Sequence, residues 1–138
     1  MKNLPVVLNH LSRGSTCAAF DGEILLQSTM RGVAPLLTWL EEGQNLEQFC
    51  VADKVVGKGA AFLYVLLGVR YLYAAVISQP ALQLLREKGV AVTFSILVPA
   101  IRNRDNTGYC PIETVVLDCA APEDALQKIK NRLKELAK

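Results

Sequence analysis

The sequence has 138 residues, of which 51 % are hydrophobic and 20 % are charged, with a formal net charge of +2. A chain of this length and apolar content can fill the core of one domain, so we expect a single domain over residues 1–138. The small charge gives no strong signal for nucleic acid, and no apolar run reaches the roughly 18 residues of a membrane span. No A-x-A-like cleavage site follows the N-terminal segment, so we expect a cytoplasmic protein.

The cysteine spacing argues against the common zinc and disulfide frameworks. The chain has four cysteines and none of them forms a C-x-x-C pair: Cys17, Cys50, Cys110 and Cys119. A structural zinc knuckle is therefore not expected, and disulfides are not expected in a cytoplasmic protein. We predict no metal site and no cofactor from the sequence.

The first half of the chain predicts two helices, a hairpin and a third helix. A short helix is expected near 3–12, followed by strands at about 15–20 and 23–28, because Asp21-Gly22 between apolar runs is a strong hairpin signal. The segment GVAPLLTWLEEG, which ends at Gly43, predicts a second helix. The third helix is expected over about 53–67, with Gly68 as its end.

The second half predicts a parallel strand–helix–strand unit and a terminal helix. Strands are expected over 70–77 and 90–98, with the helix SQPALQLLREKG between them. A long polar loop follows, and TVVLDC is either a strand or the continuation of a helix. The last segment predicts an amphipathic helix with four inward apolar side chains: Ala125, Ile129, Leu133 and Leu136.

Polar residues gather where these elements should meet. Helices of a parallel α/β unit begin at the carboxyl edge of the sheet, where ligands usually bind and where free N–H groups attract anions. The predicted helix start, the next strand end and the long loop bring candidate site residues to this edge: Asp53, Lys54, Gly57, Lys58, Ser78, Asn103, Arg104, Cys110 and Glu113.

Each of these residues also has a purely structural explanation. Gly57, with Gly59 beside it, leaves room for a ligand, or only for tight packing of the helix on the sheet. Asp53 and Ser78 are typical helix caps. Lys54 and Lys58 are equally typical of exposed lysines on a solvated edge of the domain. Cys110 precedes a proline at an expected helix start, where the pKa of a thiol can be lowered, so it is a candidate nucleophile.

The order of elements resembles the cytidine-deaminase-like fold. In zinc deaminases, H-x-E or C-x-E opens the helix after the hairpin and P-C-x-x-C opens the next helix. Here ADKVVGK fills the first place, and Pro80 is followed by Ala81 and Leu84 where cysteines should stand. The motifs DKVVGKGAA, S-x-P and NR…TGYCPIE are similar to those of an uncharacterised bacterial family of this superfamily that lacks the zinc motif.

That resemblance implies a three-layer α-β-α domain, with a mixed sheet that begins with an antiparallel hairpin and continues with parallel strand–helix–strand units. It leaves several functions open. One is metal-free catalysis on a small anionic or nucleotide-like molecule, with Cys110, Asp53 and Lys58 as candidate catalytic groups. Another is a ligand sensor without turnover. A third is a regulatory or interaction subunit, and a homodimer is compatible with all three.

Overall fold

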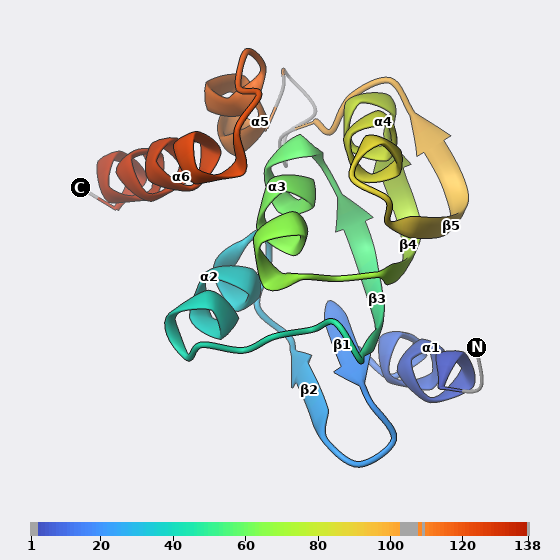
Figure 1. Cartoon of the computed structure of the whole chain (residues 1–138). Helices are drawn as coiled ribbons and strands as arrows, with labels where there is room; N and C mark the ends of the chain where they lie inside the picture. The colour runs from blue at the N-terminus through green and yellow to red at the C-terminus, as the bar shows by residue number, and fades with distance from the viewer. Residues whose placement is uncertain (1–2, 103–107, 109, 138) are drawn as a thin grey trace.

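The computed structural model describes residues 3–102, 108 and 110–137, and over these residues the protein has a mixed α/β fold (Figure 1). The sheet has five strands: β1 (Cys17–Phe20), β2 (Leu25–Ser28), β3 (Cys50–Val56), β4 (Tyr71–Ser78) and β5 (Ala91–Val98). The described residues form six helices: α1 (Leu4–Ser12), α2 (Ala34–Glu41), α3 (Lys58–Leu67), α4 (Gln79–Glu87), α5 (Pro111–Val116) and α6 (Pro122–Leu136).

The sheet is open and mixed, with the strand order β2-β1-β3-β4-β5. Strand β1 pairs antiparallel with β2 and β3, while β3, β4 and β5 run parallel. The predicted hairpin is confirmed. Its turn is closed by Asp21, whose Oδ1 accepts hydrogen bonds from the backbone N–H groups of Glu23 (2.8 Å) and Ile24 (2.6 Å). Gly22 supplies the positive φ of 106° in this turn.

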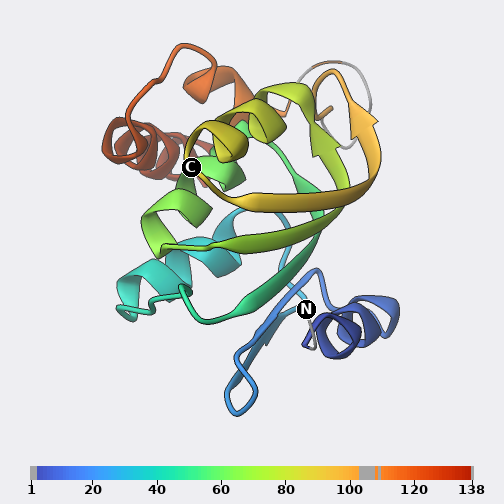
Figure 2. The same cartoon turned by 45° about the vertical axis from the view of Figure 1, so that its right-hand side comes forward.

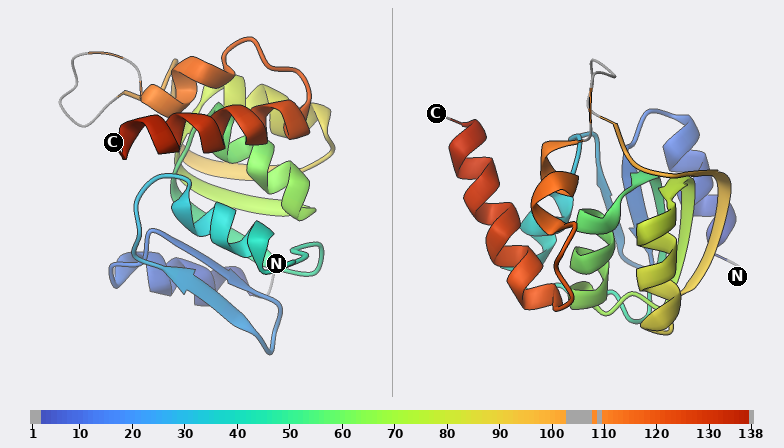
Figure 3. Two further views of the ribbon diagram at one scale, coloured as in Figure 1. Left: turned by 90° about the vertical axis from the view of Figure 1, so that its left-hand side faces the viewer. Right: turned by 90° about the horizontal axis from the view of Figure 1, so that it is seen from above.

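Helices cover the two faces of the sheet unequally. One face carries α2, α3 and α4, and α6 packs outside this layer against α3 and α5 (Figure 3). The other face carries α1, which packs against β1 and β3. Figure 2 shows that β5 forms the outer edge of the sheet, beyond the cover of α1.

Helix α3 is the centre of the core because it is apolar on nearly all sides. Seven of its ten residues are buried: Gly59, Ala60, Ala61, Phe62, Leu63, Tyr64 and Leu67. A helix that is hydrophobic all round is stable only when other elements surround it. The sheet lies on one side of α3, and α2, α4, α5 and α6 contact its other sides. Burial of this helix therefore fixes where its first turn lies.

The prediction of a helix over 53–67 is wrong in its first third. Residues Cys50–Val56 form β3, a central strand that pairs with both β1 and β4, and the helix begins at Lys58. The stretch CVADKVV favours a strand because three of its seven residues are the β-branched residue valine. Asp53 is consequently a strand residue, and the expectation that it caps a helix is wrong.

The C-terminal part follows the sequence prediction with one exception. Of the two readings of TVVLDC, the helical one is correct for residues 114–116, which end α5. Ala125 and Ile129 of α6 are buried and Leu133 packs partly against the core. The sequence places Leu136 on the inward face, but its side chain is 50 % exposed and is not among the apolar side chains that pack on the core. Among the described residues, no helix is long and apolar enough to cross a membrane.

Replacement of Ile129 by alanine tests whether α6 is an integral part of this core. The side chain is completely buried, so Ile129→Ala should lower the free energy of unfolding by about 2–5 kcal/mol in urea denaturation. Leu136→Ala on the same helix is the matched control and should change it by less than about 0.5 kcal/mol, because Leu136 is half exposed. Equal effects of the two substitutions would contradict the packing of α6 on α3.

Candidate functional site

A pocket with a volume of about 590 Å³ lies at the edge of the sheet where β3 ends and β1 begins. We call it the edge pocket. Its β-sheet side is lined by residues around β1, β2 and β3: Thr16, Cys17, Arg31, Asp53, Lys54 and Val55. Its helical side is lined by residues of α3, α5 and the segment before α5: Gly57, Ala60, Ile101, Cys110, Ile112 and Glu113. This is the sheet edge at which the sequence predicts a site.

The N-terminus of α3, which forms part of the helical wall, is occupied by a carboxylate of the chain itself. Oε1 of Glu113 accepts a hydrogen bond from the backbone N–H of Lys58 (2.6 Å), and Oε2 accepts one from Gly59 (2.9 Å). Two of the free N–H groups at the helix start are thereby paired with a negative charge, which the helix dipole also favours. Glu113 is only 8 % exposed. The N–H groups at which the sequence predicts a ligand anion are therefore paired instead with a carboxylate of α5.

Two glycines provide the space for this contact. A Cβ atom on Gly57 would lie 2.5 Å from the carboxylate of Glu113, and one on Gly59 would lie 2.8 Å from Cγ2 of Ile112. Gly57 has φ −97°, an extended conformation that any residue adopts, so its glycine is required by space and not by backbone strain. The glycines allow close approach, as the sequence indicates, but the segment that approaches them is α5 and not the sheet.

Lys58 turns its side chain toward α5 and does not line the edge pocket. Its Nζ donates a hydrogen bond to the backbone carbonyl of Leu117 (2.7 Å), just past the end of α5, and lies 5.6 Å from the ring centroid of Phe62. The carbonyl and the aromatic face both favour the ammonium charge. Lys58 and Glu113 thus hold the two ends of α5 against the start of α3.

Asp53 lies on the floor of the edge pocket and is buried, with 8 % of its surface exposed. Its Oδ2 accepts a hydrogen bond from the hydroxyl of Tyr64 on α3 (2.6 Å), and its Oδ1 accepts a longer one from the backbone N–H of Val55 (3.3 Å). Tyr64 is completely buried. The carboxyl is therefore oriented by the core helix and presented to the pocket by a central strand.

The electrostatic surroundings of Asp53 favour its neutral form. Burial raises the pKa of Asp53 from its ordinary value of 3.8 to about 7, against the opposing effect of the Tyr64 hydrogen bond. Cys17 lies opposite Asp53 in the β1–β3 register, and burial together with the charge of Asp53 raises the pKa of its thiol far above the ordinary value. Cys17 is thus a neutral thiol at physiological pH, and Asp53 can gain or lose a proton near neutrality.

The structure brings some of the predicted residues together and separates others. Five of them line the edge pocket: Asp53, Lys54, Gly57, Cys110 and Glu113. Lys58 points to α5, and Ser78 is completely buried as the N-cap of α4, where its Oγ accepts a hydrogen bond from the N–H of Ala81 (3.3 Å). The helix-cap prediction for Ser78 is confirmed. Asn103 and Arg104 lie outside the described residues.

Sequence reasoning missed Arg31, Cys17 and Tyr64. Arg31 follows β2 and lines the pocket, but nothing in its local sequence distinguishes it from an ordinary exposed arginine. Cys17 becomes a neighbour of Asp53 only through the β1–β3 register. A correct strand assignment for residues 50–56 would have predicted that an Asp in a central strand needs a buried partner, and Tyr64 on the following helix supplies it.

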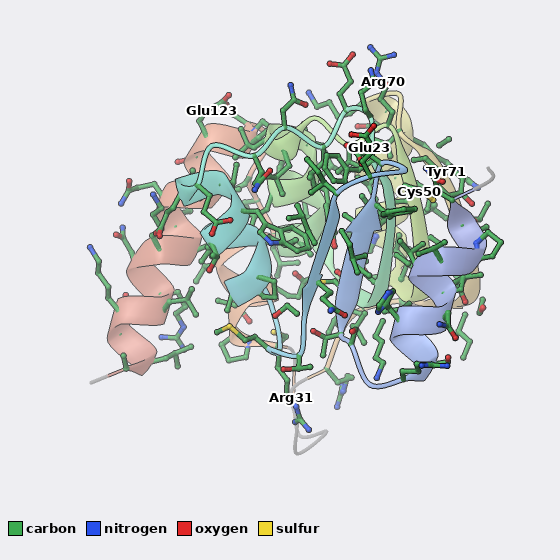
Figure 4. The ribbon with its side chains drawn as sticks, turned by 90° about the horizontal axis from the view of Figure 1, so that it is seen from below. Glu23, Arg31, Cys50, Arg70, Tyr71 and Glu123 are labelled. Atoms are coloured by element: carbon green, nitrogen blue, oxygen red, sulfur yellow. The ribbon has the colours of Figure 1, made fainter. Side chains whose placement is uncertain are left out.

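A second, smaller hollow lies at the opposite end of the sheet. Figure 4 shows Cys50, Arg70 and Tyr71 at one end of the molecule and Arg31 at the other. This hollow has a volume of about 240 Å³, and the Arg70 and Glu47 side chains within it form an ion pair with each other. The two cavities are thus separate, and only the edge pocket contains a buried carboxyl.

Comparison with known proteins places the chain in a family. The family model of TM1506, described as a domain of unknown function (DUF1893), matches residues 6–133. The chain belongs to the DUF1893 family. A search of curated proteins found none that matches. Among solved structures, the crystal structure of the DUF1893 family protein TM1506 from Thermotoga maritima, at 2.70 Å resolution, matches with a TM-score of 0.87 and 28 % sequence identity. The match covers 96 % of this chain and 91 % of the other.

A double-mutant cycle tests the contact between Glu113 and the start of α3. Glu113→Ala leaves two N–H groups without their partner, at about 1–3 kcal/mol each, and Gly57→Ala forces a Cβ into the carboxylate, at about 1–3 kcal/mol. Because Glu113→Ala also removes the atoms that the new Cβ would meet, the double variant should be more stable than the sum of the single effects predicts. Urea denaturation gives the free energy of unfolding of all four proteins, with Glu123→Gln, at an exposed position of α6, as the control. Strictly additive effects would contradict the contact.

The raised pKa of Asp53 predicts a specific pH dependence of stability. The folded protein binds more protons than the unfolded chain between pH 3.8 and about 7, so the contribution of Asp53 to stability falls as pH rises through this range. Asp53→Asn, which retains an oxygen for the Tyr64 hydroxyl, should remove this contribution. The difference in Tm between the variant and the wild type should therefore grow in favour of the variant from about pH 4 to about pH 7. A difference that is constant with pH would show that Asp53 has an ordinary pKa.

Proposed function

We propose that this DUF1893 chain is a single, zinc-free cytidine-deaminase-like domain that binds a small anionic or nucleotide-like molecule in the edge pocket. The observation that carries the proposal is the pocket itself, because its volume of about 590 Å³ is within the range of natural small-molecule sites. Its wall combines apolar side chains, a buried carboxyl at Asp53 and two exposed cations at Arg31 and Lys54. Such a combination of apolar surface and few polar groups is typical of ligand sites.

The cations are the groups available to an anionic ligand. The charge of Glu113 is already paired with the N–H groups of α3, and Lys58 is engaged with the carbonyl of Leu117. Arg31 and Lys54 are exposed and take part in none of the ion pairs of the described residues. Long-range attraction by these two charges would concentrate phosphate- or carboxylate-bearing molecules at the pocket mouth.

The residues at the positions of the deaminase zinc ligands do not fit a zinc ion. Ala81 and Leu84 of α4 stand where the two cysteines of P-C-x-x-C would stand, and both side chains are buried in the core. Within the described part of the chain, no group of three or more His, Cys, Asp or Glu residues is arranged to hold a metal ion. The reaction proposed here accordingly uses side chains of the chain in place of zinc-activated water.

Two groups of the pocket have the chemistry for metal-free catalysis. Asp53 can exchange a proton near neutral pH because of its raised pKa. Cys110, the N-cap residue of α5, is half-buried and lines the pocket, where a thiol can attack an electrophilic carbon. A sensor without turnover would use the same pocket for binding alone. A homodimeric regulatory subunit would instead rely on surfaces such as the free edge of β5, whose eight residues carry no charge and no proline.

A thermal-shift screen of nucleotides, nucleobases, sugar phosphates and organic acids tests the proposal. A ligand that binds the folded state should raise Tm in proportion to its affinity and concentration. Lys54→Ala and Arg31→Ala should each reduce the affinity for an anionic hit by about 3–10-fold, since exposed charge pairs contribute about 0.2–1 kcal/mol or somewhat more in a pocket.

The controls separate the pocket from the rest of the surface. Lys130→Ala removes an exposed lysine of α6 and should leave the affinity unchanged. Lys58→Ala should lower the stability of the unliganded protein through the loss of its bond to Leu117, with a smaller effect on affinity than Lys54→Ala. Absence of any hit, or a hit insensitive to both Lys54→Ala and Arg31→Ala, would contradict an anion site in the edge pocket and favour the interaction subunit.

A further inference from the structure

We propose that the ligand of the edge pocket is dipolar, with a nitrogen hydrogen-bond donor at the end that reaches Asp53 and an acidic group at the end that reaches Arg31 and Lys54. The inference rests on the proposed function, because it specifies the chemistry of the molecule bound in the same pocket. It assigns Asp53 to recognition of an amine, an amidine or another N–H-bearing group, and it fixes the direction in which the ligand enters.

The first argument is the unused hydrogen-bonding capacity of Asp53. An ionised carboxylate has about four lone-pair sites. The Tyr64 hydroxyl uses one on Oδ2, and the backbone N–H of Val55 makes a long contact of 3.3 Å to Oδ1. Because Asp53 lines the pocket, the remaining acceptor capacity is available to a ligand there. Each oxygen already accepts one hydrogen bond, so a ligand would use a further lone pair, which only a hydrogen-bond donor can do.

The second argument is the charge of the groups around Asp53. The neighbours that face it are the Cys17 thiol on β1 and the Tyr64 hydroxyl on α3, which are both neutral. Glu113 on α5 lines the same pocket and is acidic. None of the ion pairs among the described residues includes Asp53. The floor therefore has no positive group of its own, and a ligand nitrogen would supply the one that is missing.

The third argument is the separation of charge between the floor and the mouth. A phosphate or carboxylate beside Asp53 would meet a carboxyl group that is partly ionised near neutral pH, in a poorly solvated place, which is unfavourable. The cations of the pocket, Arg31 and Lys54, are exposed, whereas the carboxyl groups of Asp53 and Glu113 are buried. An anionic group is thus accommodated at the mouth and a donor group at the floor. The order of charges along the pocket matches a molecule with both groups.

In this arrangement, ligand binding is coupled to the release of a proton from Asp53. A nitrogen donor favours the ionised carboxylate, so binding should lower the pKa of Asp53, which burial raises to about 7 in the free protein. Binding at neutral pH should therefore release a proton from a fraction of the molecules. The affinity for a dipolar ligand should fall as pH decreases below about 7, while the affinity for a purely anionic molecule should not fall for this reason.

Matched aromatic probes test the inference. The ortho, meta and para isomers of (aminomethyl)benzoate carry both groups at graded separations. The methylbenzoates carry only the acid and the methylbenzylamines only the amine. Isothermal titration calorimetry on wild type and Asp53→Asn compares the three sets. At least one (aminomethyl)benzoate should bind wild type about tenfold more tightly than its methylbenzoate, as expected for a hydrogen bond to a charged group. Asp53→Asn should abolish this advantage, so that each (aminomethyl)benzoate binds the variant no more tightly than its methylbenzoate.

The outcomes distinguish this inference from the proposed function. If each methylbenzoate binds wild type as tightly as its aminomethyl partner, or if no probe binds, the dipolar ligand is overturned. The metabolite screen with Lys54→Ala and Arg31→Ala then still tests, independently, whether the edge pocket binds an anion. Titration of wild type at pH 6 and pH 8 gives a second readout that needs no variant: the aminomethyl advantage should be smaller at pH 6. An advantage that is equal at both pH values also overturns the inference.

Discussion

The contact between the Glu113 carboxylate and the first N–H groups of α3 is the interaction on which the candidate site depends. It joins segments that are 54 and 55 residues apart in sequence, and it places a negative charge at the positive end of the central helix. Gly57 and Gly59 are required because any side chain there would displace α5. Lys58 by itself opposes the helix dipole, but its backbone N–H donates to the same carboxylate and its Nζ donates to the carbonyl of Leu117. The two glycines and the lysine at the start of α3, which by themselves disfavour a helix, are therefore all explained by its contact with α5.

The edge pocket is a consequence of this contact. Helix α5 forms one wall because Glu113 and Lys58 hold it at both ends, and β3 forms the floor because it is the central strand of the sheet. A helix N-terminus usually offers an anion site to a ligand, but here the chain fills that site internally. The proposed ligand would therefore be recognised by side chains and not by the helix dipole, namely by the buried carboxyl of Asp53 and the exposed cations Arg31 and Lys54.

Local patterns in the sequence predict most of the fold and only part of the site. Asp21-Gly22 gives the hairpin and Pro80 with Gly89 gives the bounds of α4, because turn and cap chemistry acts over a few residues. Residues 53–56 of β3 are predicted as helix because the apolar helix that follows them extends the same hydrophobic run, and only pairing with β1 and β4 separates strand from helix. Cys110 and Glu113, which the sequence places after the last parallel strand, line the edge pocket, and Lys54 lines it from β3 and not from a helix start. The Tyr64–Asp53 bond and the role of Glu113 depend on tertiary contacts that no local pattern contains.

Amide hydrogen exchange of wild type and Glu113→Gln tests the central claim most directly, namely that Glu113 holds α5 as the wall of the edge pocket. The glutamine retains the size of the side chain but removes its charge and one acceptor oxygen. We predict that protection decreases selectively at Lys58, at Gly59 and through residues 111–116, while the central strands β3 and β4 keep their protection. Unchanged protection at these positions, or a uniform loss over the whole chain, would contradict the claim.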